Sequence, residues 1–299
     1  MAESQAHRFG QIIGEVLETA LIPVFRQFAR QHGIYLDMKG QRKCRDGLKC
    51  SWKDKYGNYH DLDFVFERGG TARKLGVPIA FIETAWRRYT KHSRNKAQEI
   101  QGAILPLADT YRNSAPLVGV VLAGVFTKGA LVQLQSVGFK ILYFPYDSVI
   151  EVFKKHGIAA DFDEDTSEKE FQHKIQDYEC LTNTQRTKLA RELIATHESD
   201  VKYFIDALTT AVSRQVKRII VLPLYGMHHE MKTIPEAIQF VEAYKQTKSL
   251  SDYIERYEIY VTFNNGNEVD GRFGDKASAI DFLRSYLPPM NKQRRFKQT

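Results

Sequence analysis

The chain has 299 residues, a net charge of +7 and a sequence pI near 9.1, with 43% hydrophobic and 26% charged residues. This composition is typical of a soluble globular protein with one large domain or two ordinary ones, and no apolar run approaches the ~20 residues that a membrane span needs. Three cysteines without a CxxC pair argue against a zinc knuckle or a disulfide framework, and the polar N-terminus lacks a signal-peptide core, so we expect a cytoplasmic protein.

Hydrophobic periodicity and turn residues predict the elements of the first half of the chain. In order they are a helix over 8–31, a hairpin formed by 48–54 and 58–67, a strand over 76–86, a helix over 94–112, a strand over 116–126, a short helix over 129–138, and a strand that runs into a helix over 140–153. The resulting order, α-β-β-β-α-β-α-β, predicts an α/β fold with a mixed central β-sheet flanked by helices.

For the second half of the chain, the sequence pattern predicts an α+β region. Its elements are helical segments over roughly 184–213, a strand over 216–226, a helix over 235–246, a hairpin over 257–273 that turns at Asn265-Gly266, and a final helix over 275–287. An acidic stretch, 160–170, separates the halves and is interpreted as a solvated linker or loop, with mimicry of nucleic-acid charge as the alternative. We therefore expect a core over residues 1–160 and a C-terminal region over 161–299, which either recognises DNA or extends the core.

Positive charge is concentrated in three segments. Residues 39–55 carry seven Lys or Arg against two Asp, residues 87–96 carry five and no acid, and the C-terminal tail adds four more at Lys292, Arg294, Arg295 and Lys297. Clustered cations of this kind favour a polyanionic partner, although the run at 87–96 also fits an ordinary solvated turn.

Two acidic residues stand on neighbouring predicted strands. Asp63 lies on the second strand and Glu83 on the third, within an otherwise apolar run. If these strands pair, the two carboxylates lie side by side, and close carboxylates repel unless a cation such as Mg²⁺ lies between them. Two alternatives stay open: Glu83 could form an ion pair with a neighbouring arginine, and Asp61, on the same strand face as Asp63, could be the acid that faces the metal.

The element order, with an acid on the second strand and a glutamate twenty residues later at the end of the third, resembles the PD-(D/E)xK nuclease superfamily. The segment WRRYTKHSRNKAQEI in particular resembles type II restriction endonucleases, and the similarity covers roughly residues 8–155. This resemblance implies a Mg²⁺-dependent endodeoxyribonuclease that cuts double-stranded DNA, most simply as a homodimer. A structure-specific repair nuclease fits the same core.

The sequence departs from the family pattern at two positions. No proline precedes Asp63, and Ala85 stands where the family motif has a lysine that orients or deprotonates the attacking water. Lys96 is our candidate substitute, with Lys91 as the second choice and Glu99 or Gln98 as support; the alternative is that Lys96 only contacts phosphate. Ala85 also supports the alternative of a catalytically inactive DNA-binding protein on a nuclease-like scaffold.

The resemblance thus implies a complete candidate site. The catalytic residues are Asp63, Glu83 and Lys96; the metal ligands are Asp63, Glu83 and Glu99; the DNA-binding residues are Arg87, Arg88, Lys91, His92 and Arg94. Some superfamily members add a glutamate from the first helix, but Glu15 and Glu18 are expected to face solvent. Trp52 and Trp86 are expected to pack in the core.

Overall fold

The computed structural model describes residues 4–223, 227–244 and 257–287. The chain forms two compact units, Met1–Val212 and Ser213–Thr299. The four cations expected in the C-terminal tail lie outside the described residues.

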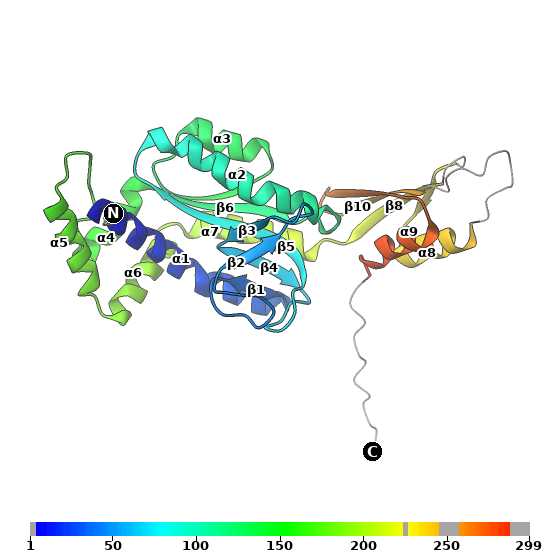
Figure 1. Ribbon diagram of the computed structural model, residues 1–299, viewed down its shortest axis with the longest axis horizontal. Coiled ribbons are helices and arrows are strands. Elements are labelled where there is room, and N and C mark those ends of the chain that lie inside the picture. The colour runs from blue at the N-terminus through cyan, green and yellow to red at the C-terminus, as the bar shows by residue number, and fades with distance from the viewer. Residues whose placement is uncertain (1–3, 224–226, 245–256, 288–299) are drawn as a thin grey trace, which may run out of the picture. The chain divides into compact units, whose positions relative to one another are not determined.

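The first unit is built on a five-stranded mixed sheet (Figure 1). Its strands, in spatial order, are β1 (Tyr35–Met38), β4 (Phe64–Arg68), β5 (Val77–Arg87), β6 (Leu117–Gly124) and β7 (Lys140–Pro145). Strand β4 runs antiparallel to both of its neighbours, β1 and β5, whereas β5, β6 and β7 are parallel. The predicted α/β class with a mixed central sheet is confirmed.

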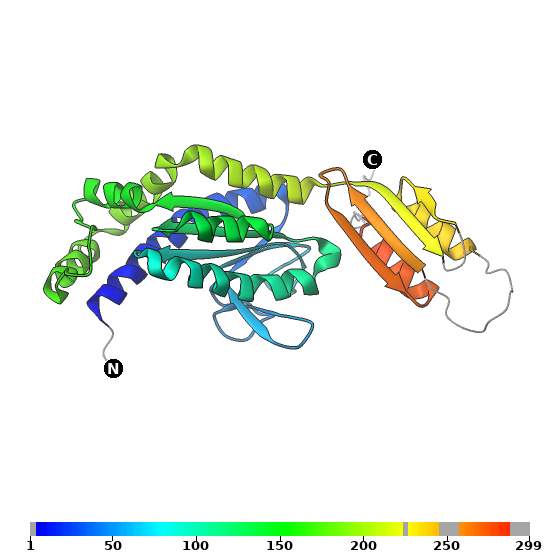
Figure 2. The ribbon, with the colours of Figure 1, turned by 90° about the horizontal axis from the view of Figure 1, so that it is seen from above.

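Helices cover both faces of this sheet, as the apolar character of the central strands requires (Figures 1 and 2). One face packs against α1 (Gln5–His32), α4 (Tyr146–Lys155), α6 (Asn183–Thr196) and α7 (Glu198–Ser213). The other face packs against α2 (Ser93–Thr110) and α3 (Lys128–Ser136). Trp86 belongs to the first core and Trp52 to the second, so the predicted core packing of both residues is confirmed.

Helix α1 follows from its sequence pattern. Apolar residues recur at helical spacing and are buried from Phe9 to Phe28. The Ser4 side chain accepts a hydrogen bond from the backbone of His7, and Gly33, with φ of 62°, ends the helix in the left-handed conformation that glycine tolerates.

The predicted hairpin is present but forms its own sheet. Strands β2 (Cys50–Lys53) and β3 (Tyr59–Leu62) pair with each other, and the chain then bends at Asp63 before β4 joins the main sheet. The segment 58–67 is therefore two strands rather than one. Strand β1, which was not predicted, takes the edge position beside β4.

The boundary between the units lies after Val212, so the predicted division at residue 160 falls inside the first unit. The reason is packing. Helix α5 (Glu168–Glu179) and α6 contribute Phe171, Ile175, Leu189 and Leu193 to the core that α1 also lines. The acidic stretch lies within this unit: residues 160–167 belong to the loop between α4 and α5, and residues 168–170 form the first turn of α5.

The second unit is a four-stranded antiparallel sheet with two helices. Its strands lie in the order β11 (Glu268–Phe273), β10 (Tyr257–Phe263), β8 (Val216–Pro223) and β9 (His229–Met231), and its helices are α8 (Ile234–Ala243) and α9 (Lys276–Arg284). The predicted hairpin turn is present, with Gly266 at φ of 84°. Across the described part of the chain, no helix is both long and apolar enough to cross a membrane.

Candidate functional site

Strand pairing brings Asp63 and Glu83 together. Phe64 of β4 lies opposite Ile82 of β5 in an antiparallel register. Asp63 precedes Phe64 and Glu83 follows Ile82, so the two acids lie opposite each other at the next position. The position of Asp63 is fixed by Thr84, which donates to Oδ2 of Asp63 from its backbone N–H at 2.7 Å and from Oγ1 at 2.6 Å. Thr84 was not predicted as a site residue, although it follows Glu83 directly in the sequence.

The environment of Glu83 favours its protonated form. Burial, the Asp63 carboxylate and a hydrogen bond with Asp63 raise the pKa of Glu83 to about 9, against the lowering effect of Lys96. Among the described residues, no ion pair joins Glu83 or Asp63 to a basic side chain. The alternative that Glu83 is held by a neighbouring arginine therefore does not describe this structure.

A third carboxylate approaches the pair from α1. Glu18 is half-buried, and burial together with the charge of Asp63 raises its pKa to about 7, with Lys39 acting in the opposite direction. The expectation that Glu18 faces solvent is wrong, because Glu18 lies on the flank of α1 next to the buried Leu17. Glu15 is exposed, as expected, and pairs with Arg8 at 3.2 Å.

Asp61 lies on the hairpin and has other partners. It accepts hydrogen bonds from Lys49 at 2.6 Å and from Ser51 at 2.5 Å, and it is exposed. Of the two aspartates that the sequence left open, the structure therefore places Asp63, and not Asp61, beside Glu83.

Lys96 lies close enough to Glu83 to lower its pKa, and it also pairs with Glu99. The Lys96–Glu99 distance is 3.1 Å, and Arg87 lies 3.7 Å from the same Glu99 carboxylate, whose side chain is 59% exposed. The structure thus places Glu99 with two cations, whereas the sequence predicted it as a metal ligand. In residues 4–223, 227–244 and 257–287, no group of three or more His, Cys, Asp or Glu side chains is arranged to hold a metal ion.

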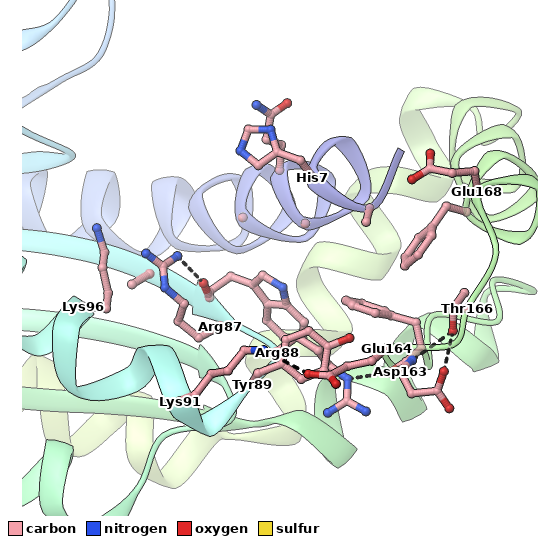
Figure 3. Close-up of a pocket in the computed structure, with 18 of the residues that line it drawn as sticks. His7, Arg87, Arg88, Tyr89, Lys91, Lys96, Asp163, Glu164, Thr166 and Glu168 are labelled. Carbon is pink, nitrogen blue, oxygen red and sulfur yellow. Dashed lines mark hydrogen bonds and ion pairs between the residues drawn. The ribbon is translucent and has the colours of Figure 1, made fainter. Parts of the chain in front are cut away.

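The basic segment after β5 faces the acidic loop. Nε of Arg88 donates to the carbonyl of Phe162 at 2.5 Å, and Lys91 pairs with Glu164 at 3.1 Å (Figure 3). Arg94 is exposed at the start of α2, and the side chain of His92 lies outside the described residues. The loop at 161–165 is therefore held against Arg88 and Lys91.

The carboxylate pair has a donor set that fits Mg²⁺. Carboxylate oxygens are the ligands this ion prefers, and it commonly takes only one or two of them and keeps several waters. Desolvation and the Asp63 carboxylate favour a proton on Glu83, and a cation between the two groups could replace that proton and remove the repulsion between two ionised carboxylates. Asp63 and Glu83, with Glu18 adjacent, are the residues of this site that could hold a metal.

No protein-family model and no curated protein matches the sequence. Among solved structures, the crystal structure of a protein of unknown function, AF1548, is similar, with 11% sequence identity and a TM-score of 0.27 over 63% of this chain and 98% of that chain. A similarity at this level carries no argument about fold or function.

Proposed function

We propose that this protein is a Mg²⁺-dependent endodeoxyribonuclease with a PD-(D/E)xK-type core that hydrolyses phosphodiester bonds in double-stranded DNA as a type II restriction enzyme. The observation that carries the proposal is the juxtaposition of Asp63 and Glu83 at adjoining strands with Lys96 nearby. A carboxyl group whose pKa is raised by desolvation and by a neighbouring acid, as the pKa of Glu83 is, is a candidate for a functional site.

The strand order supports the same family. Within the five-stranded sheet, the sequence order α1, β1, β4, β5, α2, β6 gives the expected α-β-β-β-α-β core, and the β2–β3 hairpin is an insertion between its first two strands. The first core strand is thus β1 and not a hairpin strand, which leaves the acids on the second and third core strands.

Each side chain of the site has a distinct role in the proposed hydrolysis. Thr84 fixes the Asp63 carboxylate with two hydrogen bonds, and Glu83 lies beside it. A bound Mg²⁺ would supply charge neutralisation at the phosphate and a more acidic water. Lys96 takes the role that Ala85 cannot: it positions the attacking water and offers positive charge to the phosphate. The water oxygen bonds to phosphorus and releases its proton to solvent, while the P–O ester bond breaks and the leaving oxygen takes a proton from solvent.

Double-strand cleavage needs one such site for each strand, and a two-fold homodimer is the simplest arrangement that provides both. Arg87, Arg88, Lys91 and Arg94 would contact the DNA backbone near the site. Since Arg88 and Lys91 are already paired with the acidic loop, phosphate contacts at these two residues require the loop to release them.

The test is cleavage of mixed plasmid and phage DNA with Mg²⁺, with EDTA as the control. We expect discrete fragments that require Mg²⁺, and rates lower by about 10³-fold in Asp63→Asn and in Glu83→Gln. Asp61→Asn is the matched control, because Asp61 is two residues away and bound to Lys49, and it should cut like the wild type. Activity that survives both site changes would exclude this site.

Ala85 favours a second candidate, a catalytically inactive DNA-binding protein on the same scaffold. That candidate predicts retardation of DNA in a gel without cutting at any Mg²⁺ concentration. Nicking or smearing instead of discrete fragments would indicate a less selective or structure-specific nuclease.

A further inference from the structure

Three cations gather on the two loops at the Glu67 end of strand β4. Lys43 belongs to the loop between β1 and β2, whereas Arg73 and Lys74 belong to the loop between β4 and β5. The backbone N–H of Lys43 donates to the carbonyl of Ala72 at 3.1 Å, so the three residues lie together although they are far apart in the sequence. All three are exposed, and we call them the loop cluster.

A buried arginine fixes the backbone that carries the loop cluster. Arg42 pairs with Glu67 and donates to the carbonyl of Thr71 at 2.9 and 3.1 Å and to that of Lys74 at 2.9 Å. Thr71 and Lys74 also close a tight turn through two backbone hydrogen bonds, of 2.9 and 3.3 Å. A Cβ at Gly70 would overlap the Glu67 carboxylate, so glycine at this position lets the loop pack against it. The cations are therefore presented on a backbone that is ordered without a ligand.

The loop cluster has no counter-ion of its own. In the part of the chain that the structure describes, no acidic side chain forms an ion pair with any of the three cations. Asp37 and Glu67, the buried acids at this end of the sheet, are already paired with Arg42. Asp46 is the only acid within residues 39–49 and 69–76, which form the two loops. Like charges that an ordered backbone holds together repel one another, and an anion bound among them removes that repulsion.

The loop cluster and the carboxylate site lie at opposite ends of strand β4. Asp63 and Glu67 are four residues apart, which corresponds to about 13 Å along a strand. The major groove of B-DNA is about 12 Å wide, so a duplex bound at the carboxylate site is large enough to reach the loop cluster as well. Lys39 is also exposed and follows the residue of β1 that pairs with Phe64, so exposed cations occur at both ends of β4.

We propose that the loop cluster binds the phosphate backbone of duplex DNA away from the phosphate that is cut. A DNA backbone offers several negative charges in a row, and exposed Lys and Arg side chains neutralise them without reading the base sequence. This inference rests on the proposed nuclease function and deepens it, because it adds a DNA-binding surface outside the basic segment 87–96. The loop cluster contributes to affinity and not to the chemical step.

The test measures binding of the full chain to a duplex oligonucleotide in EDTA, by fluorescence anisotropy at several salt concentrations. The cluster variant is Lys43→Gln/Arg73→Gln/Lys74→Gln. We expect its affinity at low salt to be about 10- to 100-fold lower than that of the wild type. Each lost phosphate contact lowers the slope of log affinity against log salt by about 0.9, so the loss of two or three contacts lowers it by about 2 to 3.

Two further variants separate a local contact from a general effect of charge. The matched control removes the same net charge from exposed lysines of α4, α6 and α7 and should lower the affinity less than about threefold: Lys154→Gln/Lys188→Gln/Lys202→Gln. The charge-preserving variant should bind like the wild type, because neutralisation of phosphate needs the charge: Lys43→Arg/Arg73→Lys/Lys74→Arg. Equal losses in the cluster variant and the control, or a large loss in the charge-preserving variant, overturn the proposal.

The outcome for this surface is distinct from the outcome for the proposed nuclease. With Mg²⁺ and saturating DNA, the cluster variant is expected to cut at the wild-type rate, because its cations do not contact the reacting phosphate. Binding that depends on the loop cluster, in a protein that cuts no DNA, supports the surface and contradicts the nuclease. Mg²⁺-dependent cleavage by a protein whose DNA affinity is the same in the cluster variant supports the nuclease and contradicts the surface.

Discussion

Carboxylates lie at both ends of strand β4, buried at one end and half-buried at the other, and their partners differ. At one end Glu67 is fully buried and meets Arg42 in a two-pronged ion pair, with contacts of 2.5 and 3.0 Å. At the other end Asp63 meets Glu83, which is another acid. The same strand thus carries one carboxylate that is neutralised within the fold and one that is not.

The end at Glu67 is a closed ionic network. Asp37 of β1 pairs with Arg42 at 2.7 Å and with Arg45 at 2.6 Å, and Arg42 also donates to backbone carbonyls of the loop between β4 and β5. Each charged group has an oppositely charged partner, so the network orders this loop and is neutralised without a bound ligand.

The acids at the Asp63 end have no such pairing with arginine in the described part of the chain. Ionisation is therefore disfavoured, and the pKa of Glu83 and of Glu18 is raised. At one end of the strand the acids are paired with arginines. At the other end two acids face each other, and this arrangement destabilises the unliganded protein. The difference teaches that the partners of an acid, more than its burial, distinguish the structural network at Glu67 from the proposed functional site at Asp63.

The largest expected effect tests the structural end. Arg42→Ala leaves Glu67 without its cationic partner inside the protein, and we expect it to lower the free energy of unfolding by about 3–5 kcal/mol in urea denaturation. Lys49→Ala is the control, because its pair with Asp61 is at the surface, and it should cost about 0–1 kcal/mol. If the two substitutions lower the free energy of unfolding equally, Arg42 does not neutralise Glu67 in a way that stabilises the fold, and the contrast between the two ends of β4 fails.

The next effect tests the functional end. Lys96→Ala is expected to lower the cleavage rate about 100-fold, which is typical for loss of a positioned catalytic group, while DNA affinity in EDTA stays near the wild-type value. Arg94→Ala, in the same helix, should instead weaken binding and leave the rate at saturating DNA unchanged. Near-normal cleavage by Lys96→Ala would end its assignment as the replacement for the missing lysine.

Local patterns in the sequence predicted most of the strands and helices that surround these two sites. The turn at 55–57 and the apolar run of β5 placed Asp63 and Glu83 on consecutive predicted strands, and the condition that these strands pair is met by β4 and β5. The parallel strands β6 and β7 and their helices were also predicted, because each is a long apolar run bounded by turn residues.

What the sequence did not predict depends on contacts between distant segments. Strand β1 was missed because it has four residues and contains Asp37, whose burial depends on Arg42 and Arg45 from the following loop. Both arginines were interpreted as part of a polyanion-binding run. Glu18 was assigned to solvent because helical periodicity marks the centre of an apolar face better than its flank, and only the packing of α1 beside Asp63 shows that the flank is covered.

The third prediction concerns the stability cost at the functional end. The pKa of Glu83 is about 9 in the folded protein and near 4.5 when unperturbed, so the folded state holds a proton that the unfolded state loses between these pH values. Stability in EDTA should therefore fall as the pH rises from about 4.5 to 9. Glu83→Gln, which carries no charge to bury, is expected to raise the free energy of unfolding at pH 8 by about 2 kcal/mol and to flatten this dependence.

The control for that change is Glu99→Gln, because Glu99 is exposed and paired with cations. It should leave the pH dependence as it is in the wild type. A Glu83→Gln protein that is less stable than the wild type at pH 8 would contradict the raised pKa and with it the contrast between the two ends of β4.

The smallest expected effect concerns the acidic loop. Glu164→Gln removes the partner of Lys91, so we expect about a two- to fivefold gain in DNA affinity at low salt, which disappears as salt is raised. Glu151→Gln makes the same change of net charge at an exposed position of α4 and should give a smaller gain. Equal gains in the two variants would indicate a general charge effect and no specific competition by the loop.

The most direct test of the central claim is calorimetric titration of Mg²⁺ into the wild type, Asp63→Asn and Glu83→Gln at pH 8, in buffers of different ionisation enthalpy. If Mg²⁺ replaces the proton that the raised pKa of Glu83 retains at pH 8, the wild type binds the ion and releases about one proton, and both variants lose this binding. Binding without proton release, or equal binding by all three proteins, would contradict the claim that these two carboxylates form a metal site.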